Sequence, residues 1–291
     1  MTLTAPSRLL LVHAHPDDES LWTGGTIARY AARGVQVTVV TCTLGEQGEI
    51  IPADLALLDA SVGDQLGGYR AGELRSACAA LGVTDHRYLG GIGRWRDSGM
   101  AGDPANAHPR AFTRGPIAEQ VAALGEVIAD VRPQVVVSYG ADGGYGHPDH
   151  VRAHDITVAA AAASDDVFRV CYTVRSRKAS DAGVAALASL PGLPYRLPAP
   201  GELPTVDDDT ITSVIDVEEY LPAKLRALRA HATQISVWDD GAGHSAYALS
   251  NGIALPVLTH EYFQIPGGDP ADTSTDLFAN LTGANLTGAD R

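Results

Sequence analysis

The sequence predicts an α/β fold, a Rossmann-like and mostly parallel sheet flanked by helices, on the basis of three observations. Four consecutive aliphatic residues at 9–12 are typical of a strand buried on both faces. A second run, VQVTVVT at 35–41, is rich in β-branched residues. Between them, apolar residues recur at roughly helical spacing over 21–33, and Gly34 follows as a helix stop. This strand–helix–strand order implies a right-handed crossover and parallel strands.

The rest of the chain continues the alternation of strands and helices. The pattern predicts further helices at 70–81, 117–131, 151–163 and 218–231, and further strands at 87–89, 135–139, 168–174 and 210–217. A last ordered piece is expected at 254–265. Two long polar connections, 43–68 and 90–115, exceed the usual loop length, which is typical of functional loops. Gly24 and Gly25 weaken the first helix and indicate either close packing or a late helix start.

The composition changes after residue 174, which divides the chain into three parts. We interpret 1–174 as the Rossmann-like core and 175–267 as a smaller C-terminal portion of the same domain that completes its pocket. Within that portion, 175–209 is rich in Pro, Gly, Ala and Asp, so an irregular excursion or a small lobe is expected. Residues 268–291 are expected to form a flexible tail.

Charge and cysteine content exclude several classes of protein. A formal net charge of −14 argues against a nucleic-acid surface, which needs clustered Lys and Arg. No apolar run approaches the roughly 20 residues of a membrane span, and the first strand leaves no room for a signal peptide. The three cysteines lack CxxC spacing, so we expect buried thiols in a reducing cytoplasm. Any bound metal must then be held by histidine and carboxylate.

The first strand leads directly into a group of polar residues, His13-Ala14-His15-Pro16-Asp17-Asp18-Glu19. Pro16 forces extended geometry on the residue before it, so the strand should end near His15. Ligands in open α/β sheets bind outside the carboxyl ends of the strands. The alternative, a helix start with solvated acidic residues, would explain one aspartate. It would not explain why two histidines stand at the end of a buried strand. We therefore interpret this stretch as half of a metal site.

A second motif, His147-Pro148-Asp149-His150, also lies between a strand and a helix. Its two histidines are three residues apart, so both can face one pocket if a helical turn begins there. Together with His15 and Asp18, this motif offers histidine and carboxylate ligands from two loops at the same edge of the sheet, from which two histidines and one aspartate could be drawn. Such a set, with one position left for water, is typical of a catalytic zinc site rather than a closed structural one.

The two motifs together resemble the zinc-dependent N-acetylglucosaminyl deacetylase superfamily, the LmbE-like or PIG-L group. The resemblance is closest to its actinobacterial branch in mycothiol biosynthesis, which deacetylates an N-acetylglucosaminyl-inositol. It covers residues 8 to about 260 and rests on these further stretches: TCTLGE at 41–46, DQLGGYR at 64–70, GRWRDSGM at 93–100, DGGY at 142–145 and HATQ at 231–234. The segment 175–209 matches poorly.

The resemblance implies one Zn²⁺ per subunit, bound by His15, Asp18 and His150, with Fe²⁺ as an alternative because it accepts a similar ligand set. It also implies that Asp17 is the general base that deprotonates the attacking water. Tyr145 and a protonated His147 are the candidates for stabilising the oxyanion. The donor of the proton to the leaving amine stays open between Asp17 and His147.

Other residues are expected to support this chemistry. Asp149 either accepts a hydrogen bond from His147 or another imidazole, or caps a helix, and His13 is expected behind the ligands. Arg70 and Asp97, and with less support Glu49, are expected to bind hydroxyl groups of a small aminosugar–inositol substrate. For each of the three the alternative is a surface salt bridge.

The predicted function is therefore zinc-dependent hydrolysis of the N-acetyl group of N-acetylglucosaminyl-inositol, giving glucosaminyl-inositol and acetate. The loop Arg94–Met100 favours this reaction over that of the related mycothiol S-conjugate amidase. A non-catalytic, metal-dependent glycan-binding protein is the alternative from another class, and it would not need Asp17. A nucleotide-binding module is disfavoured because no Gly-rich phosphate loop follows the first strand. The oligomeric state is open.

Overall fold

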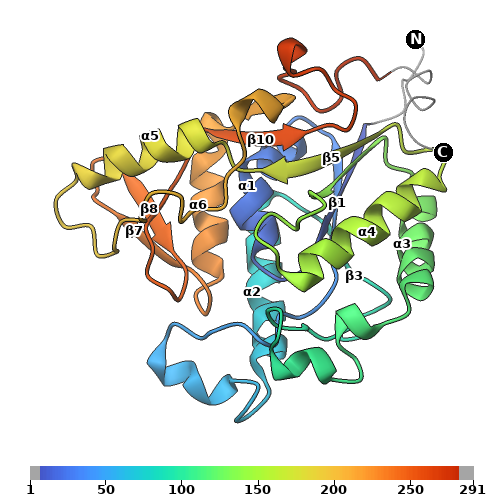
Figure 1. Cartoon of the computed structure of the whole chain (residues 1–291), viewed down its shortest axis with the longest axis horizontal. Helices are drawn as coiled ribbons and strands as arrows, with labels where there is room; N and C mark the ends of the chain where they lie inside the picture. The colour runs from blue at the N-terminus through green and yellow to red at the C-terminus, as the bar shows by residue number, and fades with distance from the viewer. Residues whose placement is uncertain (1–6, 282–291) are drawn as a thin grey trace.

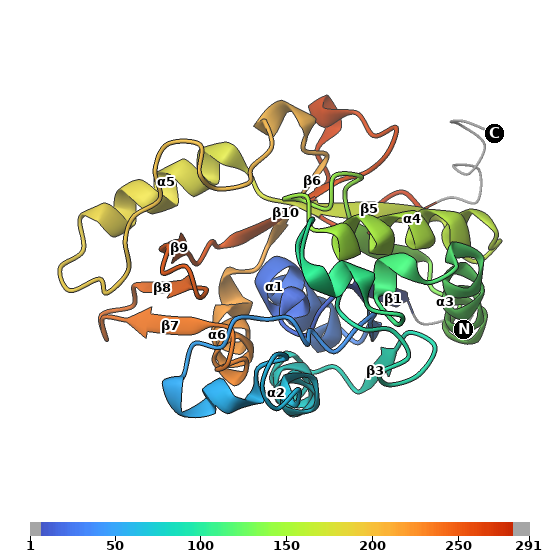
Figure 2. The same ribbon diagram turned by 60° about the horizontal axis from the view of Figure 1, so that its bottom comes forward.

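The computed structural model describes residues 7–281 and has a central sheet of mixed but mostly parallel strands (Figures 1 and 2). The strand order is β3-β2-β1-β4-β5-β10-β6. Strands β3 to β5 in this order are parallel, and β10 is antiparallel to both β5 and β6. The predicted fold class is confirmed.

The bounds of the elements follow the predicted alternation within a few residues. The strands of the large sheet are β1 (Arg8–His13), β2 (Gln36–Thr41), β3 (Asp85–Tyr88), β4 (Val135–Tyr139), β5 (Arg169–Val174), β6 (Ser213–Asp216) and β10 (His260–Gln264). The helices are α1 (Asp18–Ala32), α2 (Leu66–Leu81), α3 (Ile117–Val131), α4 (Pro148–Ala162), α5 (Arg177–Ala188) and α6 (Leu221–Ala230).

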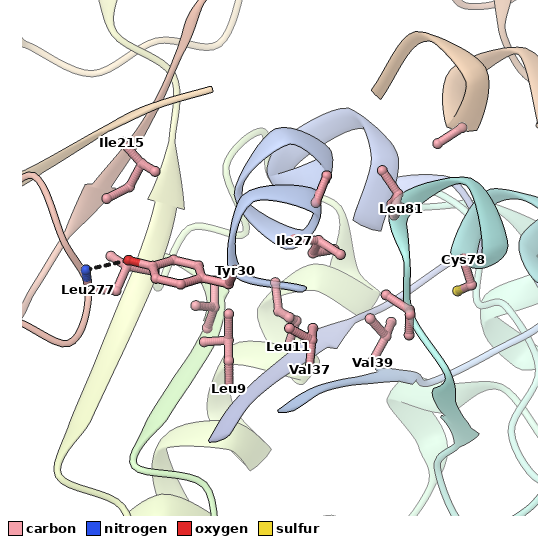
Figure 3. Packing of buried hydrophobic residues seen from close by; sticks show 14 of the residues in the cluster. Leu9, Leu11, Ile27, Tyr30, Val37, Val39, Cys78, Leu81, Ile215 and Leu277 are labelled. Atoms are coloured by element: carbon pink, nitrogen blue, oxygen red, sulfur yellow. Dashed lines mark hydrogen bonds between the residues drawn. The ribbon is translucent and has the colours of Figure 1, made fainter. Parts of the chain in front are cut away.

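Alternate residues of the buried strands face two separate hydrophobic cores. Leu9 and Leu11 of β1 pack with α1, α2 and α6 on one face of the sheet (Figure 3). Leu10 and Val12 pack with α3 and α4 on the other face. Because successive side chains of a strand point to opposite faces, a strand covered on both sides must be apolar throughout. This burial explains the unbroken aliphatic run at 9–12.

The C-terminal portion is more regular than the sequence indicated. The segment 175–209, for which an irregular excursion or a small lobe was expected, contains the helix α5. A second sheet of three antiparallel strands, β7 (Ser236–Asp239), β8 (Ser245–Ala248) and β9 (Leu255–Pro256), was not predicted. Figure 2 places α5 beside this sheet, on the side of the molecule away from α3. The sequence did not reveal the three strands because they are short, and it did not reveal α5 because this helix has few large apolar residues.

Part of the segment 268–281, which was expected to belong to a flexible tail, packs against the core through Leu277, Phe278 and Leu281. The side chain of Leu277 is fully buried, and its backbone N–H donates a hydrogen bond to the hydroxyl of Tyr30 at 2.7 Å (Figure 3). The expectation of a flexible tail therefore fails for this part of the chain. The remaining residues, 282–291, lie outside the described part.

Close packing explains the two glycines inside α1. A Cβ atom added to Gly25 would lie 2.5 Å from Cβ of Val217, closer than real atoms approach. At the same point the carboxylate of Glu261 on β10 accepts hydrogen bonds from the backbone N–H groups of Gly25 at 2.8 Å and Thr26 at 2.7 Å. Lys224 of α6 neutralises this carboxylate at 2.6 Å. Helix α1 is thus fixed to both β10 and α6 by one buried carboxylate.

We expect Glu261→Ala to lower the free energy of unfolding by about 3–5 kcal/mol, because it leaves the ammonium of Lys224 buried without a counter-charge. Urea denaturation of both proteins would measure the change. The exposed Glu218 provides the matched control, and Glu218→Ala should stay within about 0.5 kcal/mol of wild type. Equal stability of the Glu261 and Glu218 variants would contradict the structural role of the pair.

Candidate active site

The two histidine motifs meet at one edge of the sheet. Strands β1 and β4 are parallel neighbours, so their carboxyl ends lie side by side. The turn after β1 carries His15 and Asp18, and the loop after β4 carries His147 and His150. All four side chains are buried. The fold therefore brings together residues that are about 130 positions apart in the chain, as the sequence predicted.

Three donor atoms form a nearly equilateral triangle. Nδ1 of His15 lies 3.3 Å from Nε2 of His150 and 3.4 Å from Oδ2 of Asp18, and the last two atoms are 3.4 Å apart. Tetrahedral zinc with ligand bonds of roughly 2.0–2.1 Å requires donor atoms about 3.3–3.4 Å apart. The residues present therefore fit such an ion, with the fourth position left for water or substrate.

In His15 and His150, the ring nitrogen that faces away from the donor triangle lies near an oxygen atom that can accept a hydrogen bond. We call these two nitrogens the outer nitrogens. Nδ1 of His150 lies 3.1 Å from the carbonyl oxygen of Gly143. Nε2 of His15 lies 3.3 Å from Oδ2 of Asp149 and 3.5 Å from Oδ1 of Asp97. With protons on these outer nitrogens, the lone pairs of the inner nitrogens point into the donor triangle. Asp149 thus faces His15, and the cap of α4 is instead His147, which accepts from the N–H of Asp149.

Two other residue groups also come within metal-binding distance. The ring nitrogens of His147 lie close to those of His15 and His150, and the carboxylates of Asp97 and Asp149 surround His15. We favour the first triangle because Nδ1 of His15 and Nε2 of His150 both face Oδ2 of Asp18, whereas Asp97 and Asp149 face the opposite ring nitrogen of His15. Asp97 accepts from Gly99 at 2.8 Å, and Asp149 accepts from Ser98 at 2.9 Å.

Asp17 occupies a strained position beside the donor triangle. Its φ of 124° lies in a region that side-chain-bearing residues rarely adopt, a conformation that costs about 1–3 kcal/mol. Its N–H donates to Oε2 of Glu19 at 3.0 Å, and Oδ2 lies 3.1 Å from the guanidinium of Arg70. Burial raises the pKa of Asp17 to about 6, despite the opposing charge of Arg70. The carboxylate is therefore held in place and made more basic.

Glu19 holds this turn through a buried ion pair. Its Oε1 lies 2.7 Å from Nε2 of His231, and neither side chain is exposed. Burial alone would raise the pKa of Glu19, but the imidazole of His231 lowers it to about 2. Since His231 follows α6, the C-terminal portion takes part in fixing the turn that contains Asp17. The sequence motif included Glu19, but no role for it was predicted.

Arg70 is turned inward rather than toward open solvent. It is 3% exposed and donates to the carbonyl oxygens of Pro16 and Gly45, the latter at 2.6 Å. A Cβ atom on Gly45 would lie 2.1 Å from Nη1 of Arg70, so the glycine is required for this close approach. The observed contacts of Arg70 support the turn at Asp17.

Tyr139 is a site residue that the sequence did not reveal. Its hydroxyl donates to Oδ2 of Asp18 at 2.8 Å and accepts from the N–H of Ala14 at 2.8 Å. Its ring stacks on that of His150 with centroids 4.0 Å apart. His13 lies beside Tyr139, with ring centroids 5.6 Å apart, and its Nε2 is 3.0 Å from Oγ1 of Thr23. A tyrosine as the last residue of a buried strand is the one signal that could have indicated Tyr139.

Tyr145 and His147 lie beside the ligands in the loop before α4. The ring of Tyr145 is 4.9 Å from that of His150, centroid to centroid, and the residue is 46% exposed. Burial lowers the pKa of His147 to about 3, which disfavours the protonated imidazole expected from the sequence. Its Nδ1 accepts from the N–H of Asp149 at 3.2 Å, so the neutral ring carries its proton on Nε2. Neutral His147 is thus still a hydrogen-bond donor.

A cavity of about 530 Å³ opens over the donor triangle, within the usual range for small-molecule sites. Asp17, Arg70, Asp97 and Tyr145 line it, and the exposed Glu49 lies at its rim. The C-terminal portion completes it, as predicted, with Glu202, Leu203, Pro204, Gln234, Leu249, Ser250, Asn251, Ile253 and Leu255.

Among the described residues, no helix is long and apolar enough to span a bilayer.

The fold is similar to those of solved structures with different activities. An N,N'-diacetylchitobiose deacetylase from Pyrococcus horikoshii aligns over 81% of this chain and 73% of its own, with a TM-score of 0.50 and 20% identity. A 4-carboxy-2-hydroxymuconate hydratase from Pseudomonas putida aligns over 78% and 80%, with a TM-score of 0.53 and 19% identity. Because a deacetylase and a hydratase share this fold, these likenesses establish the architecture alone.

Sequence comparisons are more specific. The family model described as PIG-L, GlcNAc-PI de-N-acetylase, matches residues 10–161. A 1D-myo-inositol 2-acetamido-2-deoxy-alpha-D-glucopyranoside deacetylase from Actinosynnema mirum is 67% identical, over 97% of this chain and all of its own. A relative of the same name from Saccharopolyspora erythraea is 61% identical, over 97% of this chain and 96% of its own. With both motifs at one sheet edge, the chain belongs to the PIG-L family of de-N-acetylases.

Proposed function

We propose that this chain hydrolyses the acetamide of 1D-myo-inositol 2-acetamido-2-deoxy-α-D-glucopyranoside to the free amine and acetate, as a step of mycothiol biosynthesis. The donor triangle of His15, Asp18 and His150, with Asp17 beside it, is the observation that carries the proposal. The names and full-length coverage of the similar deacetylases support it. We further propose zinc as the metal and the cytoplasm as the compartment, for which the three buried free thiols argue.

His15, Asp18 and His150 would hold the zinc ion, which would supply a Lewis acid for the acetamide carbonyl and lower the pKa of a water toward neutrality. Asp17 takes a proton from this water as its oxygen attacks the carbonyl carbon. A carboxylate with a pKa of about 6 is mostly ionised at pH 7 and still basic enough for that step. The turn between Pro16 and Glu19 keeps the base oriented before substrate arrives.

The negative charge that develops on the carbonyl oxygen needs hydrogen-bond donors. The hydroxyl of Tyr145 and the Nε2–H of neutral His147 both belong to the loop that lines the cavity, and we assign this role to them. The C–N bond then breaks, and the amine nitrogen takes the proton that Asp17 received from the water, because neutral His147 has no acidic proton to give. For the sugar and inositol hydroxyls we propose Glu49 at the rim, together with the cavity-facing edges of Arg70 and Asp97.

The related S-conjugate amidase reaction would use the same carbonyl chemistry, and only the substrate would differ. The relatives that bear the deacetylase name favour the acetylated amine as substrate. A non-catalytic glycan-binding protein has no use for a strained, buried carboxylate beside its metal. The effect of replacing Asp17 therefore distinguishes an enzyme from a glycan-binding protein. Activity measured on both substrates distinguishes the deacetylase from the amidase.

We expect Asp17→Asn to lower kcat for amine release by about 10²–10⁴-fold, because the general base is lost while the side chain keeps its shape. Zinc-loaded wild type and variant are compared on the acetylated glucosaminyl-inositol and on a mycothiol S-conjugate, with metal content measured on the same samples. Asp103→Asn, at another acid that lines the cavity, serves as the control and should stay near wild type. Full activity of the Asp17 variant would exclude the base assignment.

We expect Asp149→Asn to weaken zinc affinity about 10–100-fold, because the amide holds the outer nitrogen of His15 less firmly than the carboxylate does. His150→Ala, which removes a ligand, should prevent stoichiometric binding. Competition with a fluorescent chelator measures both, and Asp155→Asn on the exposed face of α4 is the control. Zinc affinity unchanged in both variants would place the metal elsewhere. Reconstitution with Fe²⁺ without oxygen tests the alternative metal.

A further inference from the structure

Arg175 lines the same cavity as the donor triangle, and no step above uses it. It follows β5 directly, and β5 is the parallel neighbour of β4, so its end faces the same edge of the sheet. A hydrogen bond fixes the backbone of Arg175, because its carbonyl oxygen accepts from the N–H of Val206 at 2.9 Å. The next residue, Ser176, is buried and caps α5 by accepting from Ala179 at 3.0 Å. Arg175 is therefore a half-buried cation on a rigid support.

The guanidinium of Arg175 has a face contact but no acidic partner. Its central carbon lies 5.4 Å from the ring centroid of Trp22. Among the ion pairs within residues 7–281, none involves Arg175; Glu202 across the cavity is paired with Arg196 at 2.6 Å. An arginine always carries its charge and five N–H donors. Arg175 also lines a smaller cavity of about 40 Å³ beside Trp22. A half-buried guanidinium at the wall of a ligand cavity, without an ion-pair partner among the described residues, is suited to bind a ligand.

Trp22 relates the position of Arg175 to that of Asp18 in the donor triangle. Trp22 is one helical turn after Asp18, about 6 Å along α1. A Cβ atom on Gly144 would lie 3.2 Å from the Trp22 ring, so this ring also borders the loop that carries Tyr145. The guanidinium of Arg175 lies over this ring, and both residues line the cavity. It therefore belongs to the part of the cavity wall that Trp22 forms, one helical turn from Asp18 and within reach of the second ring of a two-ring substrate.

We propose that Arg175 binds hydroxyl groups of the inositol ring and so determines specificity for the two-ring substrate; this rests on the proposed deacetylase function. The planar fork of a guanidinium matches two adjacent hydroxyl oxygens. An anionic ligand group is disfavoured, because the carboxylates of Asp97, Glu49 and Glu202 line the same cavity. The ligand is therefore a neutral polyol rather than a phosphate.

The test compares Arg175→Gln with wild type on two substrates, acetylated glucosaminyl-inositol and N-acetylglucosamine, which lacks the inositol ring. Loss of hydrogen bonds from a charged donor should lower kcat/KM for the two-ring substrate about ten- to hundredfold, mainly through KM. The value for N-acetylglucosamine should not change. Arg175→Lys, which keeps the charge without the fork, should give an intermediate loss and carries the test if the Gln variant does not fold.

Arg177 provides the matched control, since its side chain is 54% exposed and paired with Asp207 at 3.3 Å. Arg177→Gln should match wild type on both substrates. Equal losses on the two substrates in the Arg175 variants would mean a purely structural role, and no loss on either would mean no contact; both results overturn the inference. If wild type releases amine from neither substrate, the proposed function itself fails, and the inference fails with it.

Discussion

The buried ion pair between Glu19 and His231 is the interaction on which the site depends. One oxygen of Glu19 accepts from His231, and the other accepts from the N–H of Asp17. The strain at Asp17 costs about 1–3 kcal/mol, while each hydrogen bond to a charged group contributes about 1.5–3 kcal/mol. The contacts of Glu19 and Arg70 are thus sufficient to hold a conformation that the local sequence disfavours. The C-terminal portion contributes His231, so it takes part in orienting Asp17, the proposed base.

Helix α1 links this turn to the rest of the molecule. Its first residue is the proposed ligand Asp18, its middle is fixed by Glu261, and Tyr30 near its end binds the segment at Leu277. Two buried carboxylates, Glu19 and Glu261, therefore attach one helix to elements more than 200 residues later in the chain. Because a displacement of α1 would move Asp18 and Trp22 together, the same contacts align the proposed metal ligand Asp18 with the proposed second-ring subsite.

Much of this arrangement was predictable from the sequence because it depends on local patterns. Aliphatic runs identify buried strands, and the order of strands and helices implies a parallel sheet whose ends share one edge. The HPDD and HPDH motifs at two such ends then predict His15, Asp18 and His150 as neighbours, and the donor triangle is consistent with that set. Predictions failed where the pattern was weak: α5 has few large apolar residues, and β7, β8 and β9 are short.

Only the tertiary structure decided the partners of the polar side chains. The sequence alone determined which residues lie at the sheet edge, because hydrophobic periodicity and the two motifs are local properties. It did not determine that Asp149 faces His15, that Arg70 turns inward to Pro16, or that Tyr139 supports the site. Those contacts join residues from distant elements, and whether a buried polar atom finds a partner depends on three-dimensional packing. The same reason explains why Arg175 emerged as a candidate only from the folded chain.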